Sequence, residues 1–412
     1  MSEEKGSLTT QGTTAPSTPP VGASATSLSA EAPKQAEFVE VDDVDALPDD
    51  PKVLKSALQG MKSHIAEIKK THVPMVLEYQ QYITRPPATK QQLWQQACSN
   101  DGVTAESWRE TWIKHITENV NVHGADEHMV DQLFGKHKYM PGICAGSGPS
   151  LKKNIKVLAK DKPDEFPVHS ALHNYAFMVD NDVDCEYFFT LDAGPVTLTE
   201  VYEGGTKPSE YYWDSTKDKT LVAGLPCLPA LIEKWQGKVY WFNATIPDPV
   251  YMQEMMKITK NKWVYSVGGN VLGAAVYHSL FVSGCCPTVM LGADFAFGYD
   301  RHFHSWDSDY DKKFAGVLPV TDVFGNRVYT WPSYFNFKSY FDFLSMGGNS
   351  GHPVQMINCS EGGTLGAYPE GNIVSIKQMS LEQFFGAYKN FQKYPELMAE
   401  SAKKGQEFIA MI

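Results

Sequence analysis

The sequence predicts an α/β protein with a mostly parallel, doubly wound sheet, and three observations support this fold class. From Met140 onward, short apolar runs alternate with helical patterns. Several of these runs are apolar throughout, as strands covered on both faces are. Glycine turns or aspartates follow some of them, and in such sheets ligands bind outside the carboxyl ends of the strands. We therefore expect the functional residues at strand ends.

Length and charge restrict the class of protein. The 412 residues suffice for one large or two ordinary domains. The net charge is −12 and no basic stripe is present, so we expect no nucleic-acid partner. No apolar run is long enough to span a membrane and the start lacks a signal core, so we expect a soluble, cytoplasmic protein. The seven cysteines contain no C-x-x-C pair and are predicted to be mainly core residues.

The N-terminal part divides into a tail and a helical region. Residues 1–46 are rich in Ser, Thr, Pro and Ala without apolar periodicity, which predicts a disordered tail. A helical region is expected over 47–135, with helices at 91–97, 104–119 and 126–134. Its first helix carries a single apolar stripe of Leu54, Leu58, Met61, Ile65 and Ile68. This 54–68 helix either packs on its own chain or mediates an oligomer or partner contact.

The α/β domain is expected over 136–379, with C-terminal helices over 380–412. The predicted strands are 143–145, 167–170, 187–191, 220–223, 239–242, 264–267, 288–291, 354–359 and 373–376. Ser380 to Gln383 has the pattern of a capping box, which predicts the start of a helix. An aromatic block over 329–343 has helical spacing and is predicted to pack in the core.

The first strand of this domain runs into the turn Gly146-Ser147-Gly148-Pro149-Ser150, and a helix follows. Glycines permit positive φ and close approach of a ligand, and Ser150 is a candidate N-cap. The N–H groups of the first helical turn would then converge on an anion such as a phosphate. Alternatively, the glycines serve only steric needs. The spacing matches neither a P-loop nor the dinucleotide fingerprint.

Two aspartates and a second glycine turn also follow predicted strands. Asp192 follows 187–191, and Asp294 follows 288–291. Gly268-Gly269-Asn270 joins a strand to a helix predicted over 271–283, which makes a second anion-ready turn. Together these features fit a phosphorylated ligand, and either carboxylate could hold a divalent cation or a sugar hydroxyl. Structurally, an aspartate at a strand end is also a common turn or cap residue.

A loop rich in His and Asp follows Asp294. His302 or His304 could be the general base that takes a proton from an acceptor hydroxyl, or both could join an aspartate around a metal ion. Arg301 could neutralise phosphate charge. A solvated loop without function is the alternative.

These motifs together resemble the 6-hydroxymethylpterin diphosphokinase MptE-like family, whose domain is shared by motility accessory factor flagellin glycosyltransferases. The resemblance covers about residues 136–378 and rests on Ala145 to Leu151, Thr190 to Asp192, Gly268 to Val271 with Gly284, Leu291 to Ala296, and Ile357 to Gly363. It implies a Rossmann-like nucleotide-binding core similar to that of bacterial sialyltransferases.

By position, the resemblance implies that Gly146, Ser147, Gly148 and Ser150 face a phosphate. The residues implied around the nucleotide are Asp192, Gly269, Asn270 and Asp294, with Asn358 and Glu361 closing the site. The Asp-Leu-Asp-Gly and His-Ala-His-Gly-Asp-Asn segments of the archaeal pterin kinases are absent. That departure moves the expectation toward the glycosyltransferases.

The favoured hypothesis is a glycosyltransferase that moves a nonulosonic acid from a CMP-type donor to a hydroxyl acceptor on a protein or glycan. It requires no metal, and His302, His304 and Asp294 are its candidate catalytic residues. The alternative is pyrophosphoryl transfer from ATP to a hydroxymethylpterin, with Mg²⁺ held by Asp192 and Asp294. A third hypothesis is a non-catalytic binding protein that retains the fold.

Overall fold

The computed structural model describes residues 90–260, 263–297, 317–348, 354, 356–367 and 375–391. Several sequence predictions lie outside these residues. They are the disordered tail, the 54–68 helix, the site residues Arg301, His302 and His304, and the part of the C-terminal helices after residue 391.

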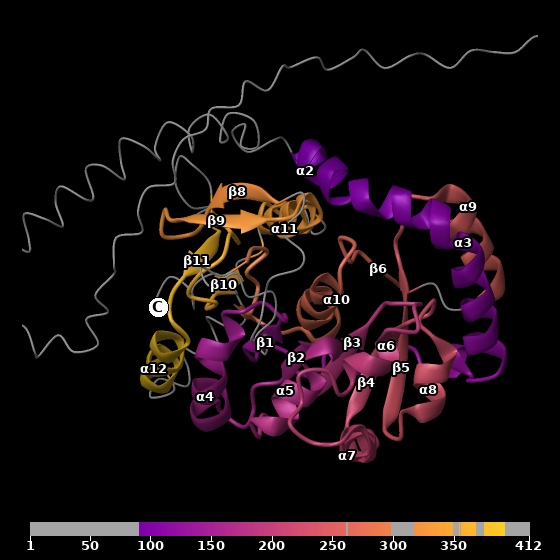
Figure 1. The fold of residues 1–412 in the computed structure, drawn as a ribbon, viewed down its shortest axis with the longest axis horizontal. Coiled ribbons are helices and arrows are strands. Elements are labelled where there is room, and N and C mark those ends of the chain that lie inside the picture. Colours follow the sequence, from indigo (N-terminus) through magenta and orange to yellow (C-terminus); the bar gives the residue numbers. More distant parts are fainter. Residues whose placement is uncertain are drawn as a thin grey trace, which may run out of the picture. The chain divides into compact units, whose positions relative to one another are not determined.

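The predicted α/β fold is confirmed by a nine-stranded sheet in which every paired strand runs parallel to its neighbour (Figure 1). The strand order is β11-β10-β7-β1-β2-β3-β4-β5-β6. The strands are β1 Gly142–Ala145, β2 Val168–Ala171, β3 Tyr187–Thr190, β4 Thr220–Gly224, β5 Lys238–Ala244, β6 Val264–Tyr265, β7 Thr288–Leu291, β10 Met356–Asn358 and β11 Ile376–Gln378.

The strand order reverses between β1 and β7. From β1 the chain adds strands outward on one side as far as β6, then returns to place β7 on the other side of β1. Residues Ala145 and Leu291 are partners in register, so both strands end at the same level. A reversal of this kind leaves a crevice at the carboxyl ends of the two strands, where doubly wound sheets bind ligands.

Helices cover both faces of the sheet. The helices are α2 Lys90–Ala97, α3 Ser99–Asn121, α4 Leu151–Asp161, α5 Tyr175–Asp180, α6 Thr197–Glu200, α7 Ser209–Ser215, α8 Pro229–Lys234, α9 Pro249–Ile258, α10 Val271–Tyr277, α11 Pro332–Ser345 and α12 Leu381–Phe391. Short 3-10 turns lie at Ala125–Glu127, Val130–Leu133, Leu172–Asn174 and Thr216–Asp218.

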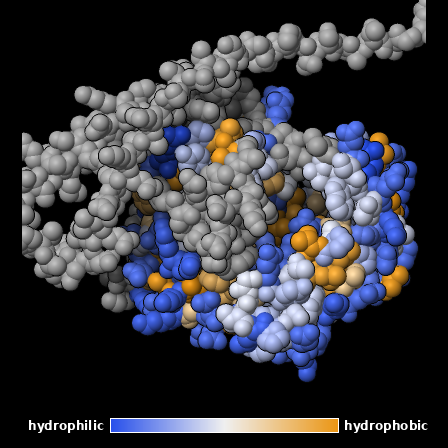
Figure 2. All heavy atoms as spheres, in the orientation of Figure 1, coloured by the Kyte–Doolittle hydropathy of each residue, from blue (hydrophilic) through white to orange (hydrophobic). Residues whose placement is uncertain are grey.

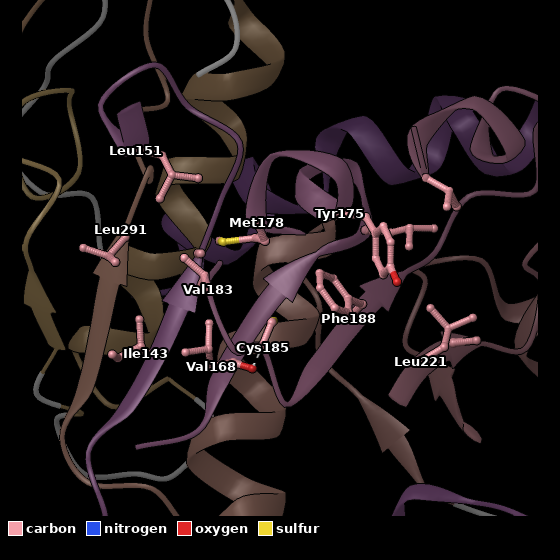
Figure 3. Packing of buried hydrophobic residues seen from close by; sticks show 14 of the residues in the cluster. Ile143, Leu151, Val168, Tyr175, Met178, Val183, Cys185, Phe188, Leu221 and Leu291 are labelled. Carbon is pink, nitrogen blue, oxygen red and sulfur yellow. Dashed lines mark hydrogen bonds between the residues drawn. The ribbon is translucent and has the colours of Figure 1, made fainter. Parts of the chain in front are cut away.

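Alternate strand residues enter different hydrophobic clusters, which explains the continuous apolar runs. On β3, Phe188 packs in the cluster that includes α4 and α5, whereas Tyr187 and Phe189 pack in the cluster that includes α10. Figure 3 shows the first cluster, in which side chains of the parallel strands meet Leu151 and Met178 from the covering helices. Burial on both faces holds the ends of β1 and β7 in fixed positions.

Two helix predictions are corrected by the structure. The helix expected over 126–134 is instead two 3-10 turns, because the chain is extended at Met129, which pairs with Trp241 of β5. The helix expected over 271–283 changes after Tyr277 into a π-helix, His278–Ser283, which ends at Gly284 with φ 75°. Glycine is suited to this left-handed helix end.

An antiparallel hairpin was missed by the sequence reading. It consists of β8 Leu318–Thr321 and β9 Arg327–Thr330, and its turn contains Gly325 with φ 83°. The strands are short and only partly buried, so their apolar pattern is weak.

Other local predictions are confirmed. In the capping box, the Ser380 amide donates to Gln383 Oε1 at 3.0 Å and the Gln383 amide donates to Ser380 Oγ at 3.1 Å. Cys144, Cys185, Cys285 and Cys359 are buried free thiols.

In the described parts of the chain, no helix is both long and apolar enough to cross a bilayer. The face shown in Figure 2 is mostly hydrophilic where it is coloured, with apolar side chains in small groups.

Candidate functional site

The glycines after β1 and β7 allow the two chain segments to lie side by side in close contact. A Cβ on Gly146 would lie 2.7 Å from the Gly292 carbonyl oxygen, and one on Gly148 would lie 2.1 Å from Asp294 Oδ2. Gly292 itself has φ 57°, and a Cβ there would lie 2.3 Å from the Gly146 oxygen. The steric explanation for these glycines therefore holds: the chain's own backbone and Asp294 occupy the space.

The amides of the glycine turn are mostly engaged within the protein. The Gly146 amide donates to the Leu291 carbonyl at 2.8 Å and the Gly148 amide to the Gly292 carbonyl at 3.0 Å. The Ser150 amide donates to Asp294 Oδ2 at 3.3 Å. Among the described residues, the Ser147 amide has no hydrogen-bond partner. The expectation that several unshielded amides converge on a ligand is therefore wrong, and Ser147 supplies the available one.

Asp294 takes the place predicted for a bound anion. Its Oδ2 also accepts a 2.7 Å hydrogen bond from Ser150 Oγ, so Ser150 occupies the N-cap position of α4 without capping it through its own side chain. A carboxylate beside the first turn of a helix is stabilised by the helix dipole. Asp294 is nonetheless 6% exposed, and burial raises its pKa to about 6 against the opposing effect of the Ser150 hydrogen bonds.

We expect Gly148→Ala to destabilise the fold by about 1–3 kcal/mol, since the new methyl group must displace Asp294 or the Gly292 carbonyl. Urea unfolding of the variant and the parent protein measures this difference. Gly362→Ala is the matched control, because a Cβ there meets no atom within 4 Å. Equal unfolding midpoints for Gly148→Ala and the parent would contradict the close contact described above.

A recess of about 190 Å³ opens at the carboxyl ends of β1, β2, β3 and β7. It lies where the strand order reverses. The predicted residues Gly146, Ser147, Gly148, Asp192, Asn270 and Asp294 line it, together with His173, Glu200, Tyr334 and Phe337. The structure therefore brings the first glycine turn and both aspartates into one cavity.

Carboxyl groups with raised pKa values line this recess. Burial and then the neighbouring charge of Asp192 raise the pKa of Glu200 to about 7, while the charge of His173 acts in the opposite direction. The pKa of the Asp192 carboxyl is also raised, because the walls of the recess remove part of its hydration. The residue nevertheless keeps enough surface area to count as exposed. His173 Nε2 lies 2.9 Å from Glu203 Oε2. Glu200 can therefore exchange a proton near neutral pH.

The second glycine turn contributes less than predicted. Gly268 and Gly269 have φ values of 59° and 73°, and a Cβ on Gly268 would lie 2.1 Å from the Tyr340 ring. Neither glycine lines the recess. Asn270 does, but its Oδ1 accepts from the Gly273 amide at 2.8 Å and its Nδ2 donates to the Gly268 carbonyl at 3.1 Å. Asn270 is thus the N-cap of α10.

Asn358 and Glu361 do not line the recess. Asn358 is 1% exposed, and its Nδ2 donates to Gln378 Oε1 at 2.9 Å, which ties β10 to β11. Glu361 accepts a 2.9 Å hydrogen bond from Asn154 Nδ2 and lines a separate recess on the other side of Asp294.

The side chains of the aromatic block lie partly in the core and partly in the recess. Tyr340 and Phe341 are fully buried, as predicted for core residues. Tyr334 and Phe337, one turn earlier on α11, line the recess with ring centroids 6.2 Å apart. A planar base can stack on such rings, whereas the sequence favoured core packing over base stacking for the whole block.

His173 and Glu200 were missed by the sequence reading, although both follow strand ends. His173 lies just after β2, and Glu200 ends the short helix that follows β3. The rule that strand ends carry function would have identified His173 as it identified Asp192. Across the residues described, no group of three or more His, Cys, Asp or Glu side chains is arranged to hold a metal ion.

A doubly wound parallel α/β domain with a recess at the reversal of strand order is a typical ligand-binding fold. Residues 114–300 match the family model described as 6-hydroxymethylpterin diphosphokinase MptE-like. The matched region includes β1 to β7 and ends before α11, Asn358 and Glu361.

Other comparisons give distant similarity. The MAf glycosyltransferase structure from Magnetospirillum magneticum AMB-1 is similar at 14% sequence identity with a TM-score of 0.43. The similar region covers 64% of this chain and 39% of that chain, so this chain corresponds to less than half of that protein's length. No curated protein matches the sequence.

Proposed function

We propose that this protein is a nucleotide-dependent glycosyltransferase, in which the recess at the ends of β1 and β7 binds the donor. The observation that carries the proposal is the presence in this recess of Glu200, whose pKa is about 7, together with the aromatic side chains Tyr334 and Phe337. An acid–base group near neutrality and a stacking surface are what a nucleotide-dependent transfer to a hydroxyl requires.

In the proposed reaction, the nucleobase stacks on Tyr334 and Phe337 and the donor phosphate lies near the Ser147 amide. The acceptor oxygen forms a bond to the anomeric carbon while the bond between that carbon and the phosphate oxygen breaks. The acceptor proton passes to Glu200, and the nucleoside phosphate leaves. Asp294 is assigned a positioning role, because it holds the turn through Ser150.

A CMP-type donor of a nonulosonic acid remains the favoured substrate. The described lining of the recess has no lysine or arginine but contains Asp192, Glu200 and Asp294. A triphosphate would meet these carboxyl groups without a compensating side-chain cation, whereas CMP carries a single phosphate group. The charge balance therefore favours the smaller phosphate.

The pyrophosphokinase alternative is supported by a different observation. Asp192 and Asp294 line the same recess, so they could hold Mg²⁺ for ATP when both are ionised. The raised pKa of Asp294, about 6, weakens such a site at acidic pH, because protonated carboxyl groups are poor Mg²⁺ ligands.

Thermal unfolding of the full chain distinguishes these functions. We expect millimolar CMP to raise the melting temperature without metal, since a ligand that binds only the folded state stabilises it. ATP should have no comparable effect with or without Mg²⁺. Stabilisation by ATP only with Mg²⁺ would favour the pyrophosphokinase, and no response to any nucleotide would favour a non-catalytic binding protein.

A further inference from the structure

A second recess of about 260 Å³ lies beside the proposed donor site. Asp294 lines both recesses, and the turn that separates them includes Gly148 on one side and Ser150 on the other. The remaining walls are formed by the start of α4, the tip of the β8–β9 hairpin and the loop after β10. The lining residues include Lys153, Asp322, Phe324, Glu361 and Gly363 from these walls, and Phe297 from the segment after β7.

The hairpin tip is held rigidly by Asp322. Its Oδ1 accepts from the amides of Phe324 at 2.9 Å and Asn326 at 2.8 Å, and its own amide donates to the Asn326 carbonyl at 2.8 Å. The Val323 amide donates to the Gly363 carbonyl at 3.0 Å, which fixes the tip to the opposite wall. The shape of this part of the recess is therefore set before any ligand binds.

This rigid turn presents an exposed aromatic side chain. Phe324 is 64% exposed, although large apolar side chains are usually buried. It stands on the same wall as Val328, while Phe297 lines the recess from the end of the chain segment that follows β7. An apolar surface held open by a network of hydrogen bonds is suited to contact with a ligand.

Polar groups lie around the apolar wall. Lys153 is exposed on the first turn of α4, and Glu361 is half-buried and held by Asn154.

Glu361 adopts φ 55°, and Phe295, next to Asp294, adopts φ 47°. Left-handed conformations are unfavourable for such residues and are concentrated at functional sites. The strain therefore surrounds the wall that the two recesses share.

We propose that the second recess binds a saccharide. This inference does not depend on the proposed glycosyltransferase function. A pyranose ring has an apolar C–H face, which packs against an aromatic ring whose face is electron-rich. Its hydroxyl groups donate to a carboxylate such as Glu361 and accept from an ammonium group such as Lys153.

The groups that line this recess favour a saccharide over a peptide. An extended peptide is recognised chiefly by main-chain hydrogen bonds along a sheet edge. The tip of this hairpin instead offers a ring face and charged side chains, which suit a compact, polyhydroxylated ligand.

Ligand-observed NMR on the full chain tests the proposal. The probes are methyl β-D-galactopyranoside and methyl N-acetyl-β-D-glucosaminide, and a blocked Ala-Ser-Gly peptide represents a protein acceptor. We expect at least one pyranoside to bind, with a Kd about five-fold higher for Phe324→Ala. Glu361→Gln should weaken the same pyranoside. Phe134→Ala is the matched control, because Phe134 is 66% exposed and lies outside both recesses.

The outcomes separate this inference from the proposed function. Stabilisation by CMP without any pyranoside binding would overturn the saccharide site and leave the transferase standing. Equal pyranoside affinity in Phe324→Ala and the parent would also overturn it, as would Phe324-dependent binding of the peptide alone. Pyranoside binding at Phe324 without any response to CMP would support the saccharide site and overturn the donor role of the first recess.

Discussion

Replacing Glu200 with glutamine is expected to lower the rate of sugar transfer by about 10²–10⁴-fold, because the amide cannot take the proton of the acceptor hydroxyl. Burial and the charge of Asp192 raise the pKa of Glu200 to about 7 in the folded protein. Since a general base acts in its ionised form, the rate for the parent protein should rise as the pH increases through about 7. The variant should lack this dependence.

The experiment measures kcat and kcat/KM between pH 5.5 and 8.5 with a CMP-activated sugar. Glu233→Gln provides the control, because Glu233 is an exposed glutamate on α8 outside the recess. A Glu200→Gln enzyme that retains both the rate and the pH profile of the parent would exclude Glu200 as the base. The catalytic role would then pass to other groups, among them His302 and His304.

Replacing Lys338 with methionine is expected to destabilise the protein by about 3–5 kcal/mol, because it deprives a buried carboxylate of its lysine partner. Lys338 Nζ lies 2.7 Å from Asp342 Oδ2, and the two side chains are 2% and 0% exposed. The pair joins successive turns of α11, the helix that carries Tyr334 and Phe337. Loss of the pair should therefore also weaken nucleotide binding at the aromatic wall.

A double-mutant cycle identifies the cause of this effect. Asp342→Leu removes the carboxylate, so Lys338→Met combined with Asp342→Leu should recover most of the stability lost in the single variant. Chemical unfolding of the parent, both single variants and the double variant measures the coupling. Simple additivity of the two losses would show that the ion pair is not the cause.

The fold was readable from the sequence because its signals are local. A strand buried on both faces is apolar at most positions, as at Phe188 and Phe189 of β3, and a glycine or aspartate marks where several such strands end. Ser380 and Gln383 predicted the start of a helix from two side chains three residues apart. The hairpin around Gly325 was missed, since its partly buried strands have no such continuous pattern.

The site was only partly readable. The sequence indicated the Gly146 turn, Asp192 and Asp294, and the structure brings them into one recess. It gave no indication that Asp294 itself occupies the N-terminus of α4, because residues 150 and 294 meet only through the parallel pairing of β1 and β7. The sequence also did not identify Glu200 as a functional residue, since the raised pKa of its carboxyl group depends on burial and on the charge of Asp192.

The amino-acid sequence by itself determined the α/β fold, most of the strands and the strand ends at which polar residues gather. Hydrophobic periodicity and turn chemistry are properties of neighbouring residues, so the chain displays them without folding. Only the tertiary structure decided which amides remain available, which carboxyl groups titrate near neutrality and which aromatic rings line a cavity. Those properties arise from contacts between distant segments, above all between the ends of β1 and β7 and the helix α11.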